Sequence, residues 1–139
     1  MIKIPLFKQG PGECGPTALQ MWLKYYGVDS NIKELVKLTG VTDTHWADPW
    51  DLQHVAEKYG INSAVRVAPD GENPKIAMNA LERIVCGGTP VIVSWMASIR
   101  NGAEDHYVVI CGIGKREGYK VIHYADPFTR GYRREWLDH

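Results

Sequence analysis

The sequence lacks the features that mark membrane-spanning, secreted and nucleic-acid-binding proteins. None of its apolar runs approaches the roughly 18 residues that a membrane-spanning helix needs, and its start lacks the apolar core of a signal peptide. Lysines plus arginines and aspartates plus glutamates number 16 each, and no basic block stands out. We therefore expect no nucleic-acid partner, no membrane segment and a cytoplasmic location.

Cysteine is scarce as well, with only Cys14, Cys86 and Cys111 in 139 residues. An odd number without regular spacing argues against a disulfide framework, and no Cys-x-x-Cys motif suggests a zinc site. The sequence thus predicts no cofactor and no dedicated metal site. We expect Cys86 and Cys111 to be small buried apolar residues, which leaves Cys14 as the thiol to explain.

The length predicts a single domain spanning residues 1–139. Helical periodicity dominates the first two thirds of the chain and strand-like patterns follow, which predicts a segregated α+β fold. We expect helices at 15–26, from about 32 to 39, from 49 to 60 and at 75–86. We expect strands at 61–68, 90–95, 106–111 and 119–124, a hairpin through 112–118, and a strand or helical turn at 132–137.

Cys14 stands where a glycine- and proline-rich loop meets a strongly apolar helix. Pro16 suits the first helical turn, where a missing N–H costs little, and Gly27 follows the last turn. The helix is apolar nearly all round, so we expect it to be central and buried. At its N-terminus, unpaired N–H groups and the helix dipole favour a thiolate, which makes Cys14 a candidate nucleophile.

A cysteine nucleophile needs a base and a group that orients the base. His106 opens an apolar strand after the polar loop 100–105, so its side chain can face a cleft. Asp126 ends the following strand, just before Pro127. In an antiparallel hairpin the start of one strand lies beside the end of the next, so His106 and Asp126 should meet at one edge of the sheet.

Gln9 is the candidate oxyanion donor, because the glycine-rich span up to Cys14 lets its loop fold back over the thiol. The backbone N–H of Cys14 would supply the second donor. Trp46, Trp50 and Trp95 are weaker candidates for residues that wall a substrate cleft.

The order Gln, Cys, His and Asp, with the cysteine on a helix and the other two on a sheet, resembles papain-like enzymes. More narrowly, the chain resembles the stand-alone branch of the bacteriocin-processing peptidases, which remove double-glycine leader peptides. The matching positions are Gln9, 13–19, Met21, 25–27, 88–93, 106–109 and 126–127. The resemblance implies a cysteine peptidase with Cys14 as nucleophile, His106 as base and acid, Asp126 as orienter, Gln9 as oxyanion donor and a peptide or protein as substrate.

Three other functions remain open at this stage. The same thioester chemistry serves amidases, deamidases and transglutaminase-type acyl transferases, and the fold alone does not determine the reaction. A peptide-binding module that has lost turnover could keep the same fold. Cys14, His106 and Asp126 could also bind zinc if they converge. The sequence does not indicate the oligomeric state.

Overall fold

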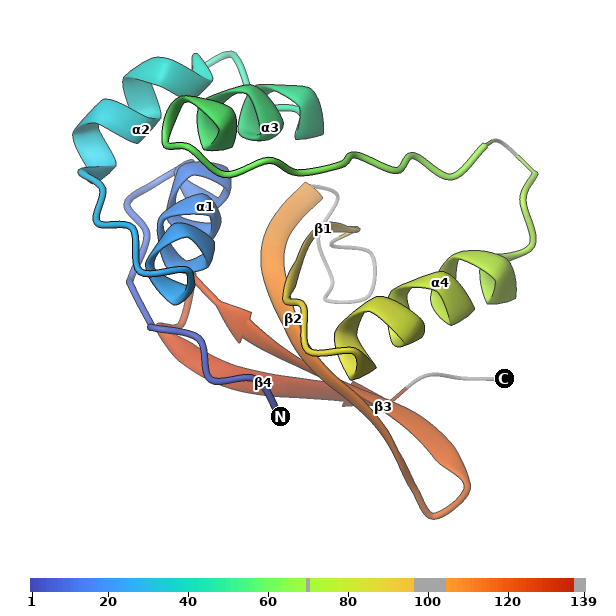
Figure 1. The fold of residues 1–139 in the computed structure, drawn as a ribbon. Helices are drawn as coiled ribbons and strands as arrows, with labels where there is room; N and C mark the ends of the chain where they lie inside the picture. Colours follow the sequence, from blue (N-terminus) through green and yellow to red (C-terminus); the bar gives the residue numbers. More distant parts are fainter. Residues whose placement is uncertain (70, 97–104, 137–139) are drawn as a thin grey trace.

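The computed structural model describes residues 1–69, 71–96 and 105–136, and within them it confirms the predicted α+β architecture. The described residues form four helices and one four-stranded antiparallel sheet (Figure 1). The helices are α1 (Cys14–Tyr25), α2 (Ile32–Thr39), α3 (Pro49–Lys58) and α4 (Pro74–Cys86). The strands are β1 (Val91–Met96), β2 (Asp105–Arg116), β3 (Tyr119–Asp126) and β4 (Gly131–Trp136).

Helix boundaries follow the capping residues in the sequence. The Asn31 side chain accepts hydrogen bonds from the first N–H groups of α2, which ends at Gly40 in left-handed geometry. Asp48 and Asp51 form a reciprocal capping box at the start of α3, each side chain accepting from the backbone N–H of the other at 2.9 Å. These local bonds satisfy N–H groups that a helix end otherwise leaves unpaired.

Helix α1 is the buried central helix that its composition predicts. Nine of its twelve residues are buried, and they include the whole first turn. Its far half is tied to the segment before β1, because the Trp22 indole N–H donates to the Pro90 carbonyl at 3.1 Å. A helix covered on nearly all sides is held in place by its neighbours, so its first residue, Cys14, has a fixed position.

The sheet is a simple meander with the strand order β1-β2-β3-β4. Strands β2 and β3 form the predicted hairpin, although the turn is only Glu117 and Gly118, far shorter than the expected connection. Both turn residues have positive φ, 53° and 83°, which is the geometry of a two-residue turn that matches strand twist. A register shift between Ile110 and Gly112 changes the pairing along β2.

Each face of the sheet carries its own apolar core. Tyr107 and Val109 of β2 pack with α1 on one face, whereas Val108 and Ile110 pack with Val85 of α4 on the other. This alternation is expected for a central strand whose successive side chains point to opposite faces. Figure 1 shows the resulting layers, with α1, α2 and α3 on one side and α4 on the other.

The first ten residues run alongside the sheet and are anchored to it at several points. The N–H of Ile2 donates to the Cys111 carbonyl at 2.9 Å. The Tyr132 hydroxyl bonds both the N–H and the carbonyl of Ile4, at 2.8 and 2.9 Å. Finally, the N–H of Gln9 donates to the Pro127 carbonyl at 2.9 Å, which brings Gln9 to the residue after Asp126.

Two further sequence expectations are wrong. Residues 61–68 do not form a strand but an extended connection from α3 to α4, which crosses between the two sides of the sheet in Figure 1. Their alternating exposure persists, but a strand also needs a partner edge, and in the described chain these residues pair with none. Cys86 is exposed at the end of α4, whereas Cys111 is buried as expected.

Candidate functional site

Cys14 is the first residue of α1 and is only 2% exposed. The next residue, Gly15, lies against the Tyr107 ring of β2, since a Cβ at this position would be 3.2 Å from the nearest ring carbon. The same Cβ would be 3.5 Å from the Ala47 side chain. The absence of a side chain at Gly15 therefore lets the helix start approach both the sheet and the loop before α3.

His106 and Asp126 meet at the edge of the sheet where the hairpin geometry predicts them. The His106 Nε2 atom lies 2.7 Å from Asp126 Oδ1. The Asp126 side chain is fully buried and that of His106 is 14% exposed. Because Nε2 bonds the carboxylate, the nitrogen left for other partners is Nδ1.

The environment of His106 favours its protonated form. Burial by itself lowers the pKa of the imidazolium, but hydrogen bonds to Asp126 and to the Cys14 side chain, together with the charges of both groups, raise it to about 9. The structure thus brings Cys14, His106 and Asp126 together.

Phe128 is a site residue that the sequence analysis missed. Its N–H donates to Asp126 Oδ1 at 3.0 Å, and its ring meets the His106 ring edge-on with centroids 6.4 Å apart. The Lys8 ammonium donates to the Phe128 carbonyl at 3.0 Å and lies 5.8 Å from the ring centroid. A phenylalanine two residues after a strand end carries no distinctive signal, so only the fold reveals this contact.

Gln9 lies at the same end of the sheet, next to the residue that follows Asp126. Its amide nitrogen donates to the Gly10 carbonyl at 3.3 Å. Its amide oxygen is buried and has no hydrogen-bond partner among the described residues. The amide nitrogen carries two hydrogens, and the described residues accept only one of them, so the second is available to a bound group.

The three tryptophans that sequence analysis proposed lie in different settings. Trp46 is 45% exposed and precedes Ala47, the residue that contacts the start of α1 at Gly15. Trp50 is 56% exposed in the first turn of α3. The backbone of Trp95 pairs with His106 in the sheet, but its side chain lies outside the described residues.

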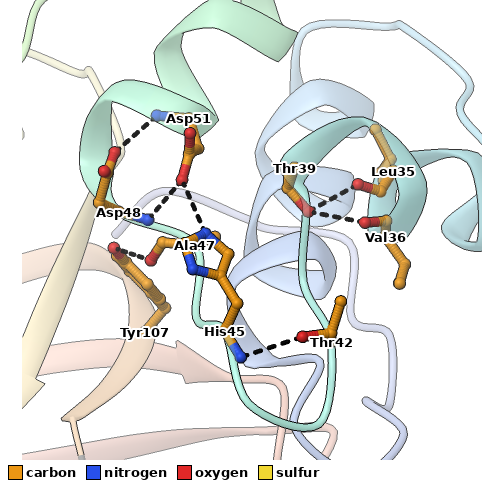
Figure 2. Close-up of polar contacts among 9 residues, drawn as sticks. All are labelled: Leu35, Val36, Thr39, Thr42, His45, Ala47, Asp48, Asp51 and Tyr107. Atoms are coloured by element: carbon orange, nitrogen blue, oxygen red, sulfur yellow. Dashed lines mark hydrogen bonds and ion pairs between the residues drawn. The ribbon is translucent and has the colours of Figure 1, made fainter.

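Tyr107 is the second residue that the sequence analysis missed as part of the site. Figure 2 shows its hydroxyl reaching across to the loop before α3, where it donates to the Ala47 carbonyl at 2.8 Å. A tyrosine in an apolar strand is indistinguishable from a core residue by sequence. Its position immediately after the candidate base is the one signal that could have singled it out.

Comparison with known proteins identifies the family. The family model described as "Peptidase_C39 like family" matches residues 1–138. The chain belongs to this family. A search of curated proteins found no significant match.

The fold of this Peptidase_C39 like family member also resembles a solved structure, a double glycine motif protease from an AMS/PCAT transporter in complex with its leader peptide. The TM-score is 0.56 and the sequence identity is 16%. The alignment covers 96% of this chain and 80% of the other. The likeness supports a papain-like, cysteine-peptidase-type fold.

None of the helices in the described part of the chain could span a membrane. Nor do the described residues include a group of three or more histidine, cysteine, aspartate or glutamate side chains placed to hold a metal ion.

Proposed function

We propose that this chain is a cysteine peptidase that cleaves a peptide bond through a thioester intermediate. The observation that carries the proposal is the position of His106, which is bonded to the buried carboxylate of Asp126 at 2.7 Å and also interacts with the Cys14 side chain. Acyl transfer to a thiol requires a nucleophile that contacts a base, and a further group that orients this base.

In the acylation step, the Cys14 sulfur attacks the carbonyl carbon of the scissile peptide bond and a C–S bond forms. The carbonyl oxygen takes the negative charge, which the Gln9 amide and the N–H of Cys14 stabilise. The first N–H groups of a helix have no acceptor within the helix, so the N–H of Cys14 is free to take this part. The C–N bond then breaks as the His106 imidazolium gives its proton to the departing amine.

In the deacylation step, neutral His106 takes a proton from water, and the resulting hydroxide attacks the thioester carbon. The C–S bond breaks, the carboxylic acid product leaves, and the thiolate–imidazolium pair is restored. Asp126 keeps its bond to Nε2 throughout, so Nδ1 is the nitrogen that exchanges protons. Two proton transfers therefore pass through one imidazole.

We propose an extended peptide segment as the substrate. The solved protease with a similar fold holds a leader peptide, which supports a peptide ligand without identifying the one that this chain accepts. The exposed Trp46 precedes Ala47, which packs against Gly15, and it offers apolar surface to such a segment.

The proposal is tested by product analysis. Wild type and Cys14→Ala are each incubated with a peptide library, and the products are identified by mass spectrometry. We expect new amino and carboxyl termini with wild type alone. Identical product sets from both proteins would remove Cys14 from the mechanism. Release of ammonia, or amide exchange with added amines, without backbone cleavage would instead indicate an amidase or acyl transferase.

Gln9→Ala should reduce turnover of a cleaved peptide by about 10²- to 10³-fold, the effect of losing one oxyanion donor, with little change in KM. The reason is that the amide stabilises charge that develops only in the transition state. The matched control is Gln20→Ala on α1, whose amide bonds the Ser30 carbonyl away from the first helical turn. Equal activity of Gln9→Ala and Gln20→Ala would exclude Gln9 as the donor.

A further inference from the structure

The loop between α2 and α3, residues 41–48, is fixed at both ends by local hydrogen bonds (Figure 2). Before the loop, at the end of α2, the Thr39 hydroxyl donates to the Leu35 carbonyl at 2.7 Å. Within it, Thr42 and His45 close a turn through bonds of 3.0 and 3.1 Å. Beyond it, Asp48 begins the capping box of α3. These bonds define the shape of the loop but not its position relative to the sheet.

One buried hydrogen bond joins this loop to the strand that carries His106. The Tyr107 hydroxyl donates to the Ala47 carbonyl at 2.8 Å, between residues that are 60 positions apart in sequence. The Tyr107 ring also forms the surface against which Gly15 lies. A single side chain at the start of β2 thus contacts two other segments, the start of α1 and the loop 41–48.

We propose that Tyr107 is a positioning residue that holds the loop 41–48, and with it Trp46, as one wall of the peptide-binding site next to Cys14. The inference rests on the proposed peptidase function. Ala47 is buried against Gly15, the residue after Cys14, and the exposed Trp46 is its neighbour in the loop. A large apolar side chain that is 45% exposed at this point gains burial when a peptide covers it.

The variant Tyr107→Phe isolates the hydrogen bond, because it keeps the ring that packs on Gly15 and removes the hydroxyl. The matched control is Tyr124→Phe in β3, since Tyr124 is also buried but belongs to the core on the other face of the sheet and bonds Glu135. Trp46→Ala and the double variant Tyr107→Phe/Trp46→Ala complete a double-mutant cycle.

We expect Tyr107→Phe to raise KM for a cleaved peptide by about 2- to 12-fold, the range for one lost hydrogen bond, while kcat changes less. The rate at which iodoacetamide alkylates Cys14 should stay within about twofold of wild type, because this small reagent does not use the loop. Hydrogen exchange of the backbone amides in residues 41–48 should accelerate. In the Trp46→Ala background, removing the hydroxyl should have little further effect on KM.

The inference would be overturned by unchanged exchange in residues 41–48, by an unchanged KM, or by a parallel slowing of iodoacetamide alkylation, which would mark general damage to the site. An effect of Tyr107→Phe on KM that persists in full without Trp46 would also contradict it. If wild type cleaves no peptide, the proposed function fails, and the exchange rates alone still decide whether Tyr107 anchors the loop.

Discussion

Cys14→Ala should reduce peptide cleavage by roughly 10⁴- to 10⁶-fold, since removal of a nucleophile leaves only binding and oxyanion stabilisation. The measurement is kcat on a peptide that wild type cleaves, with folding checked by circular dichroism. Cys86→Ala is the matched control, because the Cys86 thiol is exposed at the end of α4 and belongs to the other side of the sheet. This control should keep wild-type activity.

The same two thiols allow a test that needs no substrate. By accessibility alone, iodoacetamide should modify the exposed Cys86 before the buried Cys14. If His106 activates the sulfur of Cys14, the order reverses near neutral pH, since the thiolate is the reacting species. Burial raises the pKa of the Cys111 thiol to about 11, so Cys111 should react with iodoacetamide more slowly than the other two thiols. Faster modification of Cys86 at pH 6–7 would contradict an activated Cys14–His106 pair.

Asp126→Asn should lower kcat/KM by up to about 10⁴-fold and shift its pH dependence. In wild type, the hydrogen bond and charge of Asp126 help to raise the pKa of His106 to about 9 against the lowering effect of burial. An asparagine removes the charge, so the pKa of His106 falls and the imidazolium is lost at lower pH. The alkaline limb of the pH profile should therefore move down from about 9 toward the ordinary value of about 6.5.

The matched control for this variant is Asp29→Asn, which also removes one carboxylate but from an exposed pair with Lys24. Its pH profile should coincide with that of wild type. The midpoint of the limb does not depend on how much protein is correctly folded, so it remains informative even if the buried substitution destabilises the chain. An alkaline limb that stays in place in Asp126→Asn would show that Asp126 does not control the protonation of His106.

Much of this arrangement follows from local sequence. The start of α3 was predictable because Asp48 is a favourable N-cap residue and Pro49 suits the first helical turn. The structure shows Asp48 in a capping box with Asp51. The meeting of His106 with Asp126 was predictable because an antiparallel hairpin brings these two strand ends together. In both cases the residues that determine the feature lie within about 20 positions of one another, and the feature follows from local backbone geometry.

Other features depend on which segments meet in space. The alternating pattern at 61–68 predicts a strand, but strand pairing needs a free edge, and this segment connects helices on opposite sides of the sheet. The sequence also predicts a buried Cys86, whereas this residue is exposed at the end of α4. Phe128 contacts His106 and Tyr107 reaches Ala47 only because chain segments far apart in sequence pack together.

The sequence by itself determined where Cys14 lies, at the start of a buried helix, because proline and glycine positions and apolar periodicity act locally. Only the tertiary structure decided what surrounds that thiol. His106 interacts with the Cys14 side chain and is bonded by Asp126, while Ala47 packs on the neighbouring Gly15. These contacts are determined by packing between elements, which no local pattern encodes.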